Sequence, residues 1–133
     1  DTAEYLPPLC RSLKEALCGP RPISLTVRVA QAHFPADRAL NAGLIVNELV
    51  TNAFKYAFPD DQPGKVQVEL TQSEDGFELS VTDNGKGFAP DGQPGLGTRI
   101  VTVLAAQLGG TADWKSEQSS GCRASVKFPV AST

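Results

Sequence analysis

Hydrophobic residues recur along this chain with a helical period in three places. Apolar positions three and four residues apart predict an amphipathic helix over Ala3–Cys18, a second over about Ala36–Ala57 and a third over about Leu96–Leu108. Each of the three is followed by glycine or proline, which commonly stop a helix. The pattern therefore predicts three helices of ordinary length, separated by segments with a different period.

Strict alternation of apolar and polar residues fills most of the remaining chain and predicts five strands. Ile23–Val29 stands alone between the first two helices. The next two strands form a hairpin around the turn Ser73–Gly76, and the last two form another around Glu117–Gly121. Asp83–Gly95 is too rich in glycine and proline for regular structure. The strands of the two hairpins cover about 66–70, 77–81, 111–116 and 123–128.

The order of these elements indicates the fold class. Strands that pair as hairpins and show one apolar face build a sheet with one covered and one solvated face. We therefore predict an α+β fold, a two-layer sandwich in which a mixed sheet of about five strands carries three helices on one face. The 133 residues fit a single domain, 1–133, without repeats or an interdomain linker.

Composition narrows the classes of function. The net charge of −3 offers no general basic surface for nucleic acid, so no nucleic-acid partner is expected. No apolar run is long enough to span a membrane, and no membrane contact by this domain is expected. The three cysteines are an odd number without metal-binding spacing, which favours reduced thiols in the cytoplasm. The chain begins without Met, and we expect it to be part of a larger protein, either soluble or membrane-anchored.

The second predicted helix carries a narrow polar stripe. Glu48, Asn52 and Lys55 fall within about 60° of one another on the helical wheel, and Asp37 and Asn41 extend the line. Almost every other residue of this helix is apolar, so we expect the helix to be largely buried and the stripe to line a cavity. The alternative is a solvated edge whose side chains pair with one another. Asparagine is a poor helix former in mid-helix, which favours a functional role.

Asp83 is the second candidate. It continues the inward face of the third strand, where a carboxylate is costly unless hydrogen-bond donors surround it. Gly85 and Gly87 follow and let the backbone turn sharply near a ligand. A buried carboxylate followed by Gly-x-Gly suits recognition of the exocyclic amino group of a nucleotide base. The alternative is an aspartate that caps a turn at the end of a strand.

The third candidate is the pair Gly95 and Gly97, which precedes a helix N-terminus. Free backbone N–H groups and the helix dipole attract phosphate there, although a flexible loop entering a helix has the same pattern. The three features combine into one nucleotide site. Asp83 would hold a base, the glycine pair would hold phosphates, and Glu48 with Asn52 would face them. An amide beside a carboxylate can also share a hydrated Mg²⁺ ion with phosphates.

Three motifs of the chain resemble the N, G1 and G2 boxes of the GHKL ATPase superfamily: NELVTNAFKYAFP, DNGKGF and GLGTRIV. The superfamily includes histidine kinases, type II topoisomerases, mismatch-repair ATPases and a heat-shock chaperone. Order and spacing match over 37–110, and the flanking pattern extends the match over nearly the whole chain. Within the superfamily, GLIVNELVTNAFKYAFP and LAAQLGG are most similar to the ATP-binding domain of sensor histidine kinases of the HWE/HisKA_2 type. The resemblance implies a Bergerat-type α/β sandwich that binds ATP with Mg²⁺.

The resemblance also implies a role for each site residue. Glu48 would be the catalytic residue, near the γ-phosphate, where it would aid proton removal or water positioning. Asn52 would be the Mg²⁺ ligand, and Lys55 would lie near the phosphates. Asp83 would accept from the adenine amino group, with glycines beside the ring and flanking the ATP lid. The implied nucleotide-binding residues are Asn52, Lys55, Asp83, Gly85, Gly87, Gly95, Gly97 and Thr98.

The chain departs from the family pattern at three points. The segment between Gly87 and Gly95, which corresponds to the ATP lid, is very short and lacks a clear second aromatic box, as is usual in this subclass. Thr98 replaces the leucine that usually follows GLG. Cys122 stands where a threonine is frequent, which weakens one contact on the adenine side.

The function implied is that of the ATP-binding catalytic domain of a two-component sensor histidine kinase. It would present Mg-ATP to a His on a separate helical dimerisation domain, and a response regulator would then take the phosphate. The chain's only histidine, His33, falls in a predicted loop, so we expect it to lie on the surface and not to be the acceptor. The isolated domain would therefore be inactive.

Three other functions are weighed against this one. A GHKL serine kinase of the anti-sigma-factor type would phosphorylate a serine of a small partner protein. A degenerate ATP-site module would act as an adaptor, an alternative that Thr98 and Cys122 keep open. A gyrase-like ATPase fits least, because the chain lacks a transducer domain and its glycine loop is short.

Overall fold

One five-stranded sheet organises the chain. The computed structural model describes residues 2–17, 23–54, 64–74, 76–84, 96–117 and 121–129. The strands follow the order β1-β2-β3-β5-β4, with β1 and β2 parallel and every other neighbouring pair antiparallel. The elements are α1 (Thr2–Leu17), β1 (Ile23–Val29), α2 (Ala36–Asn52), β2 (Gly64–Ser73), β3 (Gly76–Asp83), α3 (Leu96–Gln107), β4 (Thr111–Glu117) and β5 (Gly121–Pro129).

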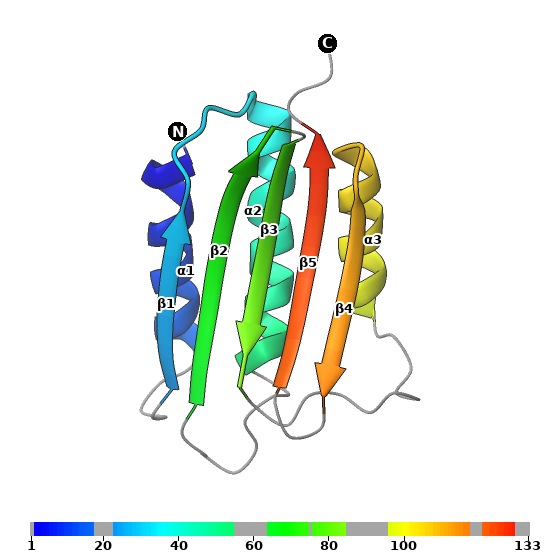
Figure 1. Cartoon of the computed structure of the whole chain (residues 1–133). Helices are drawn as coiled ribbons and strands as arrows, with labels where there is room; N and C mark the ends of the chain where they lie inside the picture. Colours follow the sequence, from blue (N-terminus) through cyan, green and yellow to red (C-terminus); the bar gives the residue numbers. More distant parts are fainter. Residues whose placement is uncertain are drawn as a thin grey trace.

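The three helices lie on one face of this sheet (Figure 1). α1 packs beside β1, α2 crosses β2 and β3, and α3 lies along β4 and β5. The predicted fold class is therefore confirmed: an α+β two-layer sandwich with a mixed sheet and helices on one side. Within the described ranges, no helix is both long and apolar enough to cross a membrane.

Helix boundaries agree with the sequence pattern at most ends. α3 stops at the predicted glycines: the N–H of Gly110 donates to the carbonyl of Ala105 at 2.9 Å, and Gly109 adopts a left-handed φ of 79°. This is the arrangement by which a glycine-terminated helix satisfies its last carbonyls. α2 ends at Asn52, although the N–H of Ala53 still donates to carbonyls of the last turn. The predicted continuation over residues 55–57 lies outside the described part of the chain.

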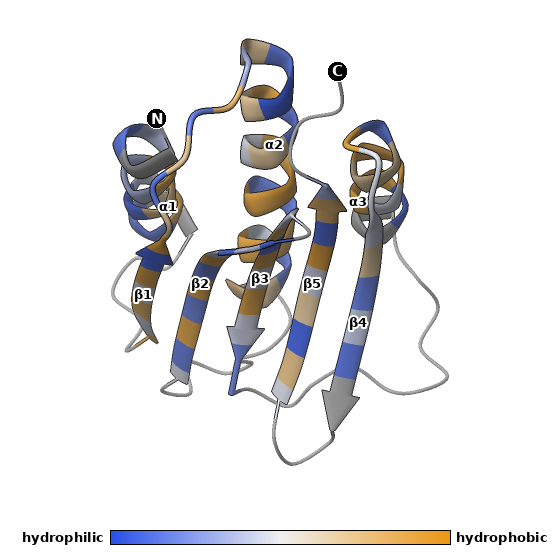
Figure 2. Cartoon of the chain, turned by 45° about the horizontal axis from the view of Figure 1, so that its top comes forward, coloured by the Kyte–Doolittle hydropathy of each residue, from blue (hydrophilic) through white to orange (hydrophobic). Residues whose placement is uncertain are grey.

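The core fills the space between the sheet and the helices. Alternate residues of each strand face the helices, and the alternation of apolar and polar positions is visible along the strands in Figure 2. The half-buried side chain of Trp114 packs against this cluster. Fully buried members include Leu6, Ile45, Val46, Val50, Phe54, Val66, Val68, Leu70, Leu79, Val101 and Leu108.

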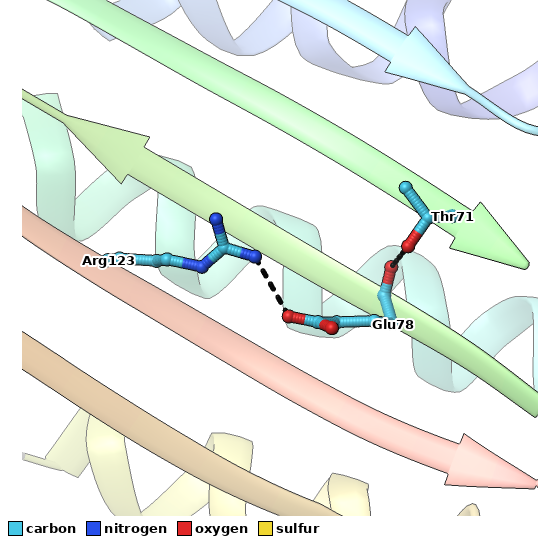
Figure 3. A network of polar contacts seen from close by, with 3 residues as sticks. All are labelled: Thr71, Glu78 and Arg123. Atoms are coloured by element: carbon cyan, nitrogen blue, oxygen red, sulfur yellow. Dashed lines mark hydrogen bonds and ion pairs between the residues drawn. The ribbon is translucent and has the colours of Figure 1, made fainter. Parts of the chain in front are cut away.

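The other face of the sheet is polar, as predicted. Arg123 of β5 donates to the carboxylate of Glu78 on β3 at 2.8 Å, and the hydroxyl of Thr71 on β2 donates to the Glu78 carbonyl at 3.5 Å (Figure 3). Both partners of the ion pair are partly exposed, so it stabilises the fold only slightly. None of the three described helices lies on this face (Figure 1).

Arg38 joins three elements at the end of the sandwich where α2 begins. Its guanidinium donates to the carbonyl of Pro129 at 2.8 Å and to that of Leu108 at 3.4 Å, and it lies 5.8 Å from the ring centroid of Phe128. The start of α2 is thereby held to the chain just beyond α3 and to the end of β5. A partly buried cation that satisfies two carbonyls contributes more than an exposed one.

Replacing Arg38 with alanine is expected to lower the free energy of unfolding by about 2 kcal/mol, because two charge-assisted hydrogen bonds and a cation–π contact are lost. For a chain of this length that corresponds to about 7 °C in Tm. Thermal unfolding followed by circular dichroism measures the shift. Arg11→Ala, the same change at an exposed position of α1, is the control and should shift Tm by no more than about 2 °C. Equal shifts for both variants would contradict the assigned role.

Candidate functional site

The predicted site elements meet at one end of the sandwich. α2 and β3 finish at the lower end of Figure 1, and α3 and β5 begin there. In the sheet, Asp83 at the end of β3 pairs with Val66 of β2 on one side and with Cys122 of β5 on the other. The described parts of the three motifs, which are distant in the sequence, therefore lie at the same end of the fold.

The polar stripe of α2 faces α3. The hydrogen bond of Asn41 shows this orientation, since its side-chain amide donates to the side-chain oxygen of Gln107 on α3 at 3.2 Å. Glu48 and Asn52 lie within about 20° of Asn41 on the helical wheel, so all three belong to the same side of α2. Both Glu48 and Asn52 are half-buried. The predicted alignment of these two side chains on one face is confirmed.

Helix register places Asn52 level with the beginning of α3. The two helices run in opposite directions, with Asn41 beside Gln107. The same number of residues separates Asn41 from Asn52 along α2 as separates Gln107 from Leu96 along α3. Since both helices rise by about 1.5 Å per residue, Asn52 comes opposite the first turn of α3. That turn contains Gly97 and Thr98, and the first backbone N–H groups of any α-helix have no partner within the helix itself.

The first half of the stripe has a different role from the one predicted. Asn41 bridges α2 and α3 instead of lining a cavity, and Asp37 is exposed in the first turn of α2. A hydrogen bond between neighbouring helices was the simpler explanation for a polar residue at a helix–helix contact. The candidate site therefore uses the last two turns of α2, not its whole length.

Asp83 is one of two buried polar or charged side chains among the described residues, with 8% of its surface exposed. The predicted inward direction is confirmed. Its cross-strand neighbour Cys122 has a free, half-buried thiol whose pKa is raised to about 12 by burial and by the Asp83 carboxylate. The thiol is therefore neutral at physiological pH. Of the other cysteines, Cys10 is a buried free thiol and Cys18 lies outside the described residues.

Gly121 is a site residue that the sequence analysis missed. It has a left-handed φ of 95°, and a Cβ built there would lie 2.0 Å from the carbonyl oxygen of Asp83. Only a residue without a side chain lets β5 approach the end of β3 so closely. The chain does carry a signal for it, because Gly121 ends the turn of the last predicted hairpin, but that turn explains the glycine without reference to the site.

The described residues account for part of the predicted site. Glu48, Asn52, Asp83 and the backbone of Gly97 and Thr98 come to the same end of the fold. His33 is exposed, as predicted, and lies between β1 and α2 at the opposite end. Four predicted site residues fall outside the described part of the chain: Lys55, Gly85, Gly87 and Gly95.

The described residues of the candidate site suit a magnesium ion that takes most of its ligands from phosphate and water and only one or two from the protein. No group of three or more His, Cys, Asp or Glu side chains among the described residues could hold a metal ion by itself. Mg²⁺ at phosphate sites needs only one or two protein oxygens and keeps several waters. The amide of Asn52, one turn from the Glu48 carboxylate and opposite a helix N-terminus, offers such a donor set.

Comparison with known proteins agrees with the geometry. Residues 38–132 match the profile of the family described as histidine kinase-, DNA gyrase B- and HSP90-like ATPase. A solved structure, the histidine kinase domain of the blue-light-activated kinase EL346 of Erythrobacter litoralis, superposes with a TM-score of 0.87 at 27% identity, covering 95% of this chain and 59% of that one.

Two curated relatives are similar over shorter stretches. Blue-light-activated histidine kinase 2 of Erythrobacter litoralis is 34% identical over 92 residues, which is 65% of this chain and 27% of the relative. Serine-protein kinase RsbW of Listeria monocytogenes is 33% identical over 66 residues, which is 50% of this chain and 42% of the relative. The chain thus spans less than half the length of either relative. The predicted resemblance to the GHKL superfamily is confirmed at the level of the family.

Proposed function

Since the chain belongs to the histidine kinase-, DNA gyrase B- and HSP90-like ATPase family, we propose that it is the ATP-binding catalytic domain of a sensor histidine kinase. The observation that carries the proposal is the meeting of a buried carboxylate, a polar helix face and a helix N-terminus at one end of the sheet. Within the family, the motifs favour the HWE/HisKA_2 type of kinase.

Asp83 would recognise the base. Its carboxylate is buried and fixed at the end of a central strand, so it can accept a hydrogen bond from the adenine amino group without reorganising. Guanine has a carbonyl oxygen in place of that amino group and would meet the carboxylate with a second acceptor. Cys122 lies beside Asp83 as a neutral thiol and adds no charge at the base. Gly85 and Gly87 would lie beside the adenine ring.

The first turn of α3 would bind the phosphates. Gly97 and Thr98 stand where the helix dipole and free N–H groups attract an anion, and Lys55 and Gly95 would complete this half of the site. Asn52 is level with this turn and would hold Mg²⁺, which supplies charge neutralisation to the phosphates. The carboxylate of Glu48 lies on the same side of α2.

The reaction would be an in-line transfer of the γ-phosphoryl group to an imidazole nitrogen. The bond between the γ-phosphorus and the bridging oxygen breaks, a nitrogen–phosphorus bond forms, and ADP leaves. Glu48 would accept the proton that the imidazole loses, or position the group that does. Positioning and charge neutralisation supply most of the rate in such transfers.

The acceptor would come from outside this domain. His33 is the only histidine in the chain, and it lies at the end of the sandwich opposite the candidate site. The partner would be a His-bearing helical dimerisation domain of the same kinase, with a response regulator as the next acceptor. The domain would act in the cytoplasm, where ATP is supplied, and the isolated chain would bind nucleotide without transferring phosphate.

A serine kinase of the anti-sigma-factor type is the second candidate. The similarity to serine-protein kinase RsbW over half of the chain is the observation in its favour. Such an enzyme would use the same nucleotide site and differ in its acceptor, a serine of a small partner protein. Phosphate attached to nitrogen is acid-labile and phosphate on serine is not, so the stability of the labelled product in acid would distinguish the two.

The proposal is tested by titrating the chain with ATP in a calorimeter, with and without Mg²⁺, and with GTP as the control nucleotide. We expect saturable binding of ATP, weaker binding without Mg²⁺, and at least about tenfold weaker binding of GTP, since one hydrogen bond would be replaced by repulsion. A folded sample that did not bind millimolar ATP would contradict the proposal and favour the adaptor alternative.

A further inference from the structure

Asn84 ends the pairing of β3 with β2 in an unusual way. Its backbone N–H donates to the carbonyl of Lys65 at 3.2 Å, and its side-chain Oδ1 accepts from the N–H of Lys65 at 2.7 Å. The side chain therefore takes the place of the backbone carbonyl that a continuing strand would offer. Asp83, one residue earlier, remains in the regular ladder opposite Val66.

We propose that Asn84 is a positioning residue that holds Asp83 in place for the base. The inference rests on the nucleotide site proposed above. Because Asn84 and Lys65 form a hydrogen-bonded pair, the alternation of an antiparallel ladder makes the adjacent pair, Asp83 and Val66, a non-hydrogen-bonded one. If the chain left the sheet directly after Asp83, no backbone hydrogen bond to β2 would hold this residue or the one after it. The two hydrogen bonds between Asn84 and Lys65 extend the pairing of β3 with β2 by one residue beyond Asp83. The glycine-rich stretch of the sequence begins at the next residue, 85.

The two sides of Asp83 are held differently. On the β5 side, Gly121 packs tightly against the Asp83 carbonyl, so a change there disturbs the packing of the sheet. On the β2 side the contact is an exposed hydrogen bond, and Asn84 itself is exposed. Loss of an exposed hydrogen bond costs little stability. Asn84 can therefore be replaced without unfolding the chain, and its effect on the nucleotide can be measured separately.

The test is the affinity of the chain for ATP and for GTP in three variants. Asn84→Ala removes the acceptor and is expected to weaken ATP binding about tenfold and to reduce the ratio of ATP to GTP affinity, with Tm within about 2 °C of wild type. Asn84→Asp keeps the Oδ1 acceptor and should bind ATP within about twofold of wild type in ~0.5 M salt, which screens its added charge. Thr71→Val removes an exposed side-chain hydrogen bond between the same two strands at their other end and is the control.

The outcomes separate the two proposals. Unchanged ATP affinity and unchanged selectivity in Asn84→Ala would overturn the positioning role while leaving the nucleotide site intact. Equal losses in Asn84→Ala and Asn84→Asp would also overturn it, because the acceptor would then not be the feature that matters. A wild-type chain that did not bind ATP would overturn the proposed function itself.

Discussion

Asp83→Asn is expected to reduce ATP binding by about 10- to 150-fold while the chain stays folded. Asparagine has nearly the shape of aspartate, but it presents a neutral amide where the proposed site needs a carboxylate. The adenine amino group would lose a charge-assisted hydrogen bond, worth about 1.5–3 kcal/mol, and would face a second donor or a weaker acceptor. Because Asp83 is buried at the end of a central strand, water cannot readily replace the lost partner.

Calorimetric titration with ATP measures this loss, and thermal unfolding shows whether the variant is folded. Asp113→Asn is the matched control, since Asp113 is an exposed aspartate on β4 and the chemical change is the same. It should bind ATP like the wild type. If Asp83→Asn bound ATP as tightly as the wild type, the base would not lie at Asp83 and the site would have to be placed elsewhere on the fold.

The fold was predictable from the sequence because its layers follow the hydrophobic periods directly. Alternation along β2 and β3 places Val66, Val68 and Leu79 in the core, and the helical spacing of the third helix does the same for Leu104 and Leu108. Glycines stop α3 where predicted, since a left-handed residue satisfies its last carbonyls. The parallel pairing of β1 with β2 and the sheet order join segments far apart in the chain, and a local period carries no information about them.

The site was predictable to a smaller extent. The strand period shows that Asp83 points inward, and the helical period aligns Glu48 with Asn52. The same helical period groups Asn41 with Glu48 and Asn52, although in the structure its side chain is hydrogen-bonded to Gln107 of α3. Gly121 and Asn84 could not be found in this way, because their roles depend on contacts between strands.

Gly121→Ala is expected to be the most damaging single change for both stability and ATP binding. The added Cβ would lie 2.0 Å from the carbonyl oxygen of Asp83 and 2.9 Å from the Cα of Asn84, and both are backbone atoms that cannot rotate away. The φ of 95° adds strain for any residue with a side chain. β5 would have to move away from the end of β3. We expect a loss of about 3 kcal/mol or more in the free energy of unfolding, which thermal unfolding measures as about 10 °C in Tm.

Alanine substitutions at two other glycines are the controls, and they separate an effect on the nucleotide site from an effect on the fold. Gly43→Ala places its Cβ at ordinary distances, 3.8 Å from Leu9 and 3.9 Å from Tyr5, within a helix where alanine is preferred, so it should leave Tm unchanged or raise it. Gly110→Ala would collide with the carbonyl oxygen of Lys127 at the opposite end of the sheet, so it should lower Tm as Gly121→Ala does. At a temperature where both are folded, Gly121→Ala and not Gly110→Ala should lose ATP affinity, because Gly121 packs against the residue that we propose binds the base. Equal ATP affinity in Gly121→Ala and Gly110→Ala would mean that the close approach of β5 to Asp83 stabilises the sheet but has no effect on nucleotide binding.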